Sequence, residues 1–346
     1  MVYVTILLAE ELPRLLFLIP HHCPNIQDFT PFFLNAPLPQ SVSALERLTV
    51  SLSHLRKLFV TVPLSADVLC QIGNLPELRE LLVQLSSEGS TQEARDIFLS
   101  TDDRFSELRV FHLRAHHLGH VTQAMSSLQR PLTELYIEVK ESDDSSTLST
   151  FATFARVFLQ HPCASSLVKL HLNVTTVGFE DEDVVSAFRP LLAVYNMSAF
   201  RVVSQCVLEL DNAFIADAAK AWPRLENLTL LPSPLPEAST RLKMTLSGLI
   251  PLIRHCPDLN FLQVSIVADP FEPSLLLPKM FNMNITSLHF THAHIDKPLA
   301  VFRCLVCMFP KLQEVTVLGS SGDWETLSSL IRESSNDIWP ILRSEL

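Results

Sequence analysis

Apolar residues recur along this chain in one short pattern: an apolar residue, two variable residues, a second apolar residue, one variable residue and a third apolar residue. Pro stands two places ahead of the pattern in four copies, which begin at Leu78, Leu225, Leu259 and Leu312. The last two apolar side chains point to the same side of an extended strand, and the residue between them points away. Each copy therefore predicts a short β-strand that buries one face and leaves the other open.

The copies are spaced by about 29 residues on average, at the upper end of the range of about 20–29 residues that is typical of leucine-rich repeats. The copy at Val203, which continues through Cys206 and Leu208, matches the pattern least well. Because no single unit of this size can bury its apolar face alone, the repetition predicts a stack of units. The first apolar residues of the copies are Leu55, Leu78, Leu108, Leu132, Leu167, Val203, Leu225, Leu259, Ile285 and Leu312.

Amphipathic segments lie between the copies. In residues 151–159, 247–256 and 299–308, apolar side chains recur at spacings of three and four, which is typical of helices that pack one face. A strand and a helix in each unit predict an α/β leucine-rich-repeat solenoid, with a curved parallel sheet on the concave side and helices on the convex side. An ordinary doubly wound α/β domain is the alternative. Only 7 of the 346 residues are Gly, however, and the nucleotide-binding turns of such domains depend on Gly.

The organisation we expect is a single solenoid over residues 1–346, with roughly ten to eleven irregular repeats. Residues 1–44 are expected to form an incomplete first repeat or a cap. Leu16–Ile26 matches Leu249–Leu259 almost position by position, so we expect the chain to open inside a repeat.

Charge and cysteine content limit the partners. The formal net charge is −11 at pH 7 and no basic run is present, which argues against nucleic acid as a partner. No apolar stretch reaches the ~18 residues of a membrane span, so we expect no membrane partner either. The seven cysteines, an odd number spread from Cys23 to Cys307, predict reduced thiols in a cytoplasmic or nuclear protein.

A helix that ends in His-Cys-Pro, Ala-Trp-Pro or Met-Phe-Pro and continues into the apolar pattern resembles the leucine-rich-repeat region of F-box proteins, above all the divergent set of mushroom-forming fungi. The match is best from Ala221 to Pro257 and extends over most of the chain from about Leu45 onward. The resemblance implies that the repeats capture the substrate of a cullin-type ubiquitin ligase. The F-box itself is not evident, so docking onto the ligase adaptor would need a module upstream. A stand-alone leucine-rich-repeat binding module without a ubiquitin role is the alternative.

The open face of the strands is where we expect a protein partner to bind. Residues between the last two apolar positions, and those two places before or after them, should point into the concave face. Exposed aromatic side chains beside polar groups are typical of protein interfaces. The candidate binding residues are Phe59, Leu82, His112, Arg114, Tyr136, Glu138, His171, Phe261, Gln263 and His289.

Three groups of His or Cys residues lie close together in the sequence, as metal or redox ligands would. Neither His group is accompanied by the Glu of a zinc hydrolase pattern, and the Cys-x-x-Cys pair lacks a second pair, so core packing explains it better. We expect no metal, no cofactor, no catalytic residue and no enzymatic activity; a hydrolase on an unusual α/β fold is the competing hypothesis. The groups are His112, His116, His117 and His120; His289, His292 and His294; and Cys304 and Cys307.

Overall fold

The computed structural model divides into two compact units. One comprises residues 1–146 and 153–167, and the other comprises residues 147–152 and 168–346. The structure describes residues 2–6, 12–33, 39–85, 98, 104–140, 148–174, 184–204, 208–232, 242–271, 280–295, 297–318 and 322–337.

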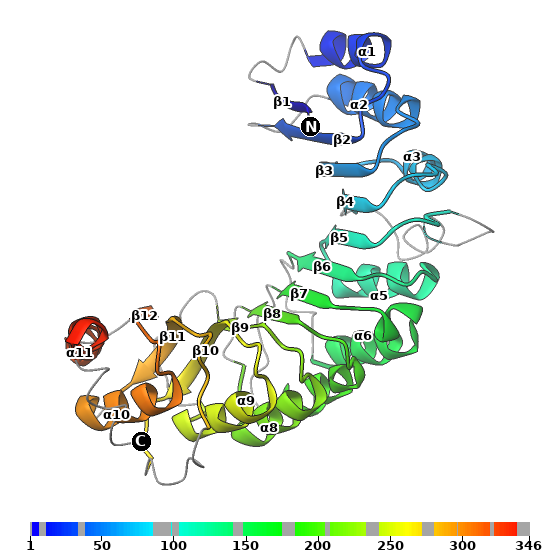
Figure 1. Cartoon of the computed structure of the whole chain (residues 1–346). Helices are drawn as coiled ribbons and strands as arrows, with labels where there is room; N and C mark the ends of the chain where they lie inside the picture. Colours follow the sequence, from blue (N-terminus) through cyan, green and yellow to red (C-terminus); the bar gives the residue numbers. More distant parts are fainter. Residues whose placement is uncertain are drawn as a thin grey trace. The chain divides into compact units, whose positions relative to one another are not determined.

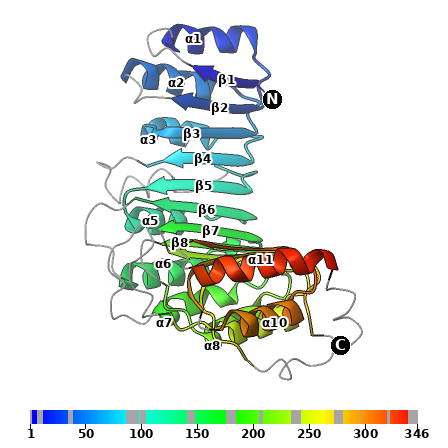
Figure 2. The same ribbon diagram turned by 90° about the vertical axis from the view of Figure 1, so that its left-hand side faces the viewer.

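Six parallel strands follow one another in chain order in the first unit, and the described helices between them lie on one side of the strands (Figures 1 and 2). The strands are β1 (Val2–Ile6), β2 (Asp28–Phe33), β3 (Lys57–Pro63), β4 (Glu80–Gln84), β5 (Val110–Ala115) and β6 (Glu134–Val139). The helices are α1 (Leu12–His22), α2 (Pro39–Ser51), α3 (Ala66–Ile72) and α5 (Leu118–Ser127). Helix α6 (Leu148–Gln160) contributes residues to both units, and the 3-10 turn η1 (Pro162–Ser165) follows it.

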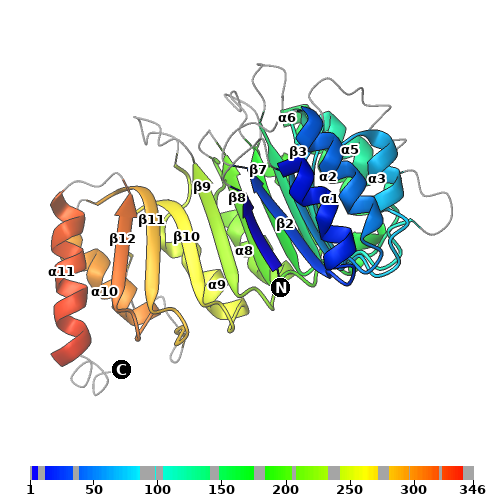
Figure 3. The same cartoon turned by 90° about the horizontal axis from the view of Figure 1, so that it is seen from above.

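The second unit repeats this arrangement with six more parallel strands in chain order (Figure 3). The strands are β7 (Lys169–Val174), β8 (Ala199–Ser204), β9 (Asn227–Pro232), β10 (Phe261–Val267), β11 (Ser287–His294) and β12 (Glu314–Leu318). The helices are α7 (Val184–Phe188), α8 (Asn212–Ala221), α9 (Ile250–His255), α10 (Pro298–Met308) and α11 (Gly322–Asp337), with 3-10 turns η2 (Arg189–Ala193) and η3 (Leu246–Leu249). One parallel strand per repeat, with helices alongside, is the α/β leucine-rich-repeat solenoid that the sequence predicts.

A ladder of backbone hydrogen bonds fixes where each strand begins. In the first unit the amide of Arg79 donates to the carbonyl of Arg56, that of Arg109 to Arg79, and that of Thr133 to Arg109, each at 2.8–2.9 Å. The second unit has the same ladder. The amide of Glu226 donates to the carbonyl of Ser198 at 2.8 Å, and the following turns continue the pattern. Because each turn is bonded to the preceding one, the strands stay in register although the loops between them differ in length.

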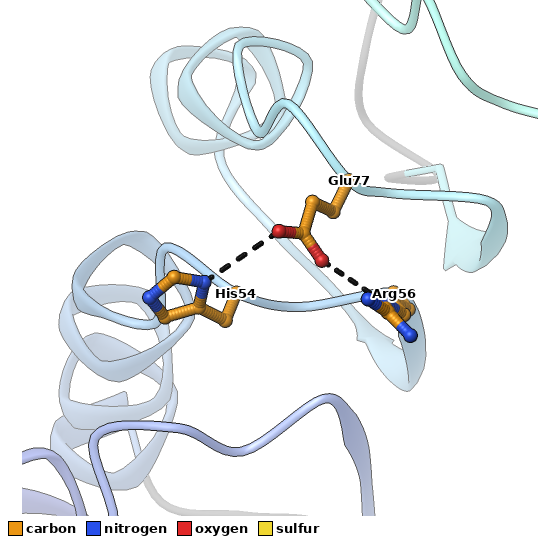
Figure 4. A network of polar contacts seen from close by, with 3 residues as sticks. All are labelled: His54, Arg56 and Glu77. Carbon is orange, nitrogen blue, oxygen red and sulfur yellow. Dashed lines mark hydrogen bonds and ion pairs between the residues drawn. The ribbon is translucent and has the colours of Figure 1, made fainter.

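Side chains add polar contacts at the same turns. Glu77 lies between Arg56 and His54 (Figure 4), with 2.9 Å from its Oε2 to the Arg56 Nε and 3.7 Å from its Oε1 to the His54 Nδ1. The hydrogen bond from Arg56 lowers the pKa of the Glu77 carboxyl group, so the carboxylate stays charged at neutral pH. All three side chains are well exposed, and exposed ion pairs add little stability.

The apolar positions of the pattern form the core, as predicted. Leu58, Leu81, Phe111 and Leu135 are fully buried on successive strands of the first unit, and Leu262 occupies the same place on β10. Phe59 and Gln263, the next residues along, are only half-buried. The predicted alternation of inside and outside is therefore confirmed on these strands.

The copy assigned to Val203 is wrong. The strand lies earlier, because Ala199 and Phe200 of β8 pair with Lys169 and Leu170 of β7. Met197, Phe200 and Val202 occupy the three apolar positions and are at most 1% exposed. Val203 is half-buried on the opposite face, Leu208 lies outside any strand, and Cys206 lies outside the described residues.

The predicted helices are confirmed. Residues 151–159 lie within α6, residues 247–255 are covered by η3 and α9 with Cys256 at the C-cap, and residues 299–308 lie within α10. Pro stands at the first turn of α9 and α10, where a missing N–H costs nothing. In the part of the chain that the structure describes, no helix has the length and apolar character that spanning a membrane requires.

Candidate functional site: the strand face of the first unit

Four of the candidate residues form a continuous row across the first unit. Phe59 on β3 pairs in register with Leu82 on β4, Leu82 with His112 on β5, and His112 with Tyr136 on β6. All four side chains are half-buried and alternate along their strands with fully buried core residues, so they lie on the face of the strands opposite the core. We call this row and the polar residues that flank it on β3–β6 the strand face.

Ring stacking gives the row a defined shape. The His112 and Tyr136 rings lie face to face, with centroids 3.9 Å apart and planes 4° from parallel. Phe59 approaches His112 from the other side, with centroids 5.3 Å apart and a tilt of 51°. Contacts of this kind are worth about 0.5–1.5 kcal/mol beyond area burial, so they restrict the orientations of the three rings.

Polar side chains at the start of these strands pair with one another or with the aromatic row. The ammonium group of Lys57 lies 2.6 Å from Oε1 of Glu80, and the hydroxyl of Tyr136 donates to Oε2 of Glu134 at 2.8 Å. Burial raises the pKa of Tyr136, and the nearby carboxylates of Glu134 and Glu80 raise it further. The phenol therefore stays protonated and acts as a hydrogen-bond donor.

The polar row on the other side carries an ion-pair network. Nε of Arg114 lies 2.6 Å from Oε2 of Glu138, and Nζ of Lys140 lies 3.3 Å from its Oε1. Arg114 and Glu138 also face each other in register across β5 and β6. The strand face thus presents an aromatic row flanked by charged side chains that already pair with one another. Such a face is better suited to contact with another protein than to binding a free ion.

The remaining candidate residues lie in the second unit and do not form one cluster. Phe261 and Gln263 on β10 lie next to His289 on β11: Gln263 pairs with His289 in register, and the Phe261 and His289 rings are 5.2 Å apart. His171 is on β7, three strands from β10 in the strand order of this unit. Nε2 of His289 lies 3.2 Å from Oγ of Ser287, a Ser–His contact without a carboxylate against His289 in the part of the chain that the structure describes.

One exposed cation of the second unit was missed by sequence reasoning. Arg201 on β8 pairs in register with His171 on β7 and with Thr229 on β9, so it occupies the middle row. Because the repeat copy was assigned from Val203, Arg201 did not fall at a predicted outward position. A copy that begins at Met197 fits the apolar pattern and lies close to the mean spacing of about 29 residues from both of its neighbours, and this signal would have found Arg201.

The His and Cys groups considered as potential ligands are dispersed or packed in the described part of the chain. His120 is buried, burial lowers its pKa, and His116 precedes helix α5 rather than sharing a helical face with it. Cys304 is 1% exposed in the α10 core, as the packing hypothesis predicts, and burial raises the pKa of Cys307. The side chains of His292 and His294 lie outside the described part. Across the described residues no three His, Cys, Asp or Glu side chains converge as a metal site would require.

Comparison with known proteins adds support for the fold. No protein-family model matches the sequence, and no curated protein matches it. The chain is similar to a chain in the crystal structure of the Rad7 and Elc1 complex in yeast, with a TM-score of 0.51 and 12% identity over 91% of this chain and 84% of that one. It is also similar to the leucine-rich repeat-containing protein LegL7 from Legionella pneumophila, with a TM-score of 0.42 and 15% identity over 86% of this chain and 87% of that one. At such identity, the likeness to the yeast structure concerns the fold alone.

Proposed function

We propose that this chain is a protein-interaction scaffold that binds its partner on the strand face of the first unit. The observation that carries the proposal is the stacked row of Phe59, His112 and Tyr136 on the face of the strands opposite the buried core residues. Aromatic residues are enriched in protein interfaces, where they contribute a large apolar area and lose little side-chain entropy.

The paired charges around the row favour a protein partner for a second reason. Lys57 and Arg114 already have carboxylate partners at 2.6 Å, so a partner does not need to neutralise them. Paired groups at a rim set the orientation and specificity of a complex more than its affinity. An aromatic centre with a polar rim is the usual anatomy of a protein interface.

A finer proposal is that the scaffold recognises the substrate of a cullin-type ubiquitin ligase, as the repeat region of an F-box protein does. The resemblance of the segment from Ala221 to Pro257 to such repeats supports it. The similar yeast chain comes from a two-protein complex, which is compatible with the same role. The proposal assigns binding rather than turnover to the chain, and the free thiols of the six described cysteines suit a cytoplasmic or nuclear location.

Affinity purification with matched variants tests the proposal. The tagged chain is compared with Tyr136→Ala and with Tyr195→Ala, a control that removes the same atoms from an exposed tyrosine of the second unit. We expect at least one protein to be recovered by the parent and by Tyr195→Ala, and to fall at least tenfold with Tyr136→Ala. Thermal unfolding of each variant verifies that Tyr136→Ala remains folded.

The identity of the recovered proteins distinguishes the general proposal of a binding scaffold from the finer proposal of a ligase substrate receptor. Recovery of a cullin and its adaptor with the partner supports the ligase role, whereas a partner that depends on Tyr136 without ligase subunits favours the stand-alone binding module. If no recovered protein depends on Tyr136, the strand face is not the binding surface.

A further inference from the structure

A second surface lies on the helical side of the first unit, in the groove between α1 and α2. The groove has a volume of about 760 Å³, within the range of about 300–1,000 Å³ for ligand-binding clefts. Leu16, Phe17 and Pro20 of α1 and Ala44, Arg47 and Leu48 of α2 are among its lining residues.

The groove combines a buried apolar floor with an exposed aromatic rim. Leu16 and Leu48 are each 1% exposed, whereas Phe17 is 70% exposed and Leu18, beside it on α1, is 46% exposed. The ring of Phe17 meets the ring of His21 edge-on, with centroids 5.4 Å apart. Phe17 is the lining residue that exposes a large apolar side chain, and burying it against a partner would be favourable, so this rim favours an apolar ligand.

The charge of the groove is positive. None of the described residues that line it is acidic, and Arg47 is exposed on its rim. Nε of Arg47 donates to the carbonyl of Ser43 at 3.2 Å, and no carboxylate pairs with the guanidinium in the described part of the chain. Glu46, the next acid along α2, accepts instead from the amide of Ser65 at 2.8 Å, at the start of α3. The amino groups of Arg47 are therefore available to a carboxylate from outside.

We propose that this groove binds an amphipathic helix of a partner protein, which packs apolar side chains between α1 and α2 and sets an Asp or Glu against Arg47. Helix α1 has 11 residues and is thus about 16 Å long, enough for roughly three turns of a bound helix. Apolar side chains spaced at i, i+3 or i+4, and i+7 would fill such a groove. The surface is distinct from the strand face, since the two lie on opposite sides of the strands.

Binding of designed helical peptides to the full chain tests this inference. Each probe is a 20-residue amphipathic helix with a fixed leucine face and one flanking position occupied by Glu, Gln or Lys; Kd is measured by fluorescence anisotropy. We expect the Glu peptide to bind at least about tenfold more tightly than the Lys peptide, a difference of about 1.4 kcal/mol. Phe17→Ser should weaken all three peptides at least tenfold, and Arg47→Glu should invert the order so that the Lys peptide binds best.

Matched controls exclude a general effect of surface change. Leu299→Ser removes a side chain that is 65% exposed in the second unit, and Arg254→Glu reverses an exposed charge on α9; both should leave all three affinities unchanged. The inference is overturned if no peptide binds the parent chain, if Phe17→Ser binds as well as the parent, or if Arg47→Glu keeps the original order. It is also overturned if sedimentation finds a dimer that Phe17→Ser dissociates, because the occupant would then be a second copy of this chain.

Discussion

Two adjacent residues of β10 allow a sharp test of the inside and outside positions of the solenoid. Leu262 is 0% exposed and lies between Leu228 of β9 and Leu288 of β11 in the core. Gln263, the next residue, is half-buried on the opposite side of the sheet and pairs with His289. The test uses two separate variants, Leu262→Ala and Gln263→Ala.

The expected magnitudes differ because only one change leaves a cavity. Leu262→Ala removes a fully buried side chain from between two leucines, and such changes cost about 2–5 kcal/mol, so we expect about 3 kcal/mol. Gln263→Ala shortens a side chain outside the core, and changes of that kind alter stability by about 0.5 kcal/mol or less.

Urea unfolding followed by tryptophan fluorescence measures both effects in the relevant unit. Trp222 and Trp324 are buried in the second unit, and none of the three tryptophans of the sequence precedes residue 222. With a urea dependence of about 2 kcal/mol per M, Leu262→Ala should lower the unfolding midpoint by about 1.5 M, and Gln263→Ala by no more than about 0.3 M. Equal shifts for the two variants would refute the assignment of inner and outer positions.

Three further predictions concern buried groups and a helix terminus. Burial lowers the pKa of His161, so its neutral form stabilises the fold above pH ~6.5; we expect the free energy of unfolding to fall by up to about 1.4 kcal/mol for each pH unit below this, and the slope to be smaller in His161→Gln. Burial raises the pKa of Cys163 and Cys256 to about 12, so iodoacetamide at pH 8 should label the exposed Cys23 in the native protein and these two only after denaturation, as read by mass spectrometry. Asp211→Ala should cost about 1 kcal/mol in urea unfolding, because this side chain caps α8; a loss below about 0.3 kcal/mol would contradict the capping role.

Most of the strand register was predictable from the sequence because the pattern has a period of two within each strand. Leu58 and Val60 alternate with Lys57 and Phe59, and Leu81 and Val83 with Glu80 and Leu82, so the inner set is apolar and the outer set is mixed. A shift of one residue would expose every inner side chain. The backbone ladder between turns then carries this local register from repeat to repeat.

Contacts on the strand face were less predictable. The sequence places His112 and Tyr136 at equivalent positions of neighbouring repeats, and the register confirms this placement. It does not specify that their rings lie parallel at 3.9 Å, because that depends on the χ angles that both side chains adopt beside Phe59. The groove between α1 and α2 was missed for a similar reason: a helical pattern identifies which residues are apolar, whereas the exposure of Phe17 depends on what packs beside it.

The error at Val203 shows how a small shift in register changes the chemistry assigned to a surface. Assigned from Val203, the repeat would place Val207 in the middle row, and the row would be apolar at this point. Assigned from Met197, as the pairing of β8 requires, it places an exposed Arg201 between His171 and Thr229. The strand whose middle position would have been assigned an apolar residue thus has a basic side chain there. Repeat spacing and apolar pattern therefore have to agree before the outward residues of a degenerate repeat can be assigned to a binding surface.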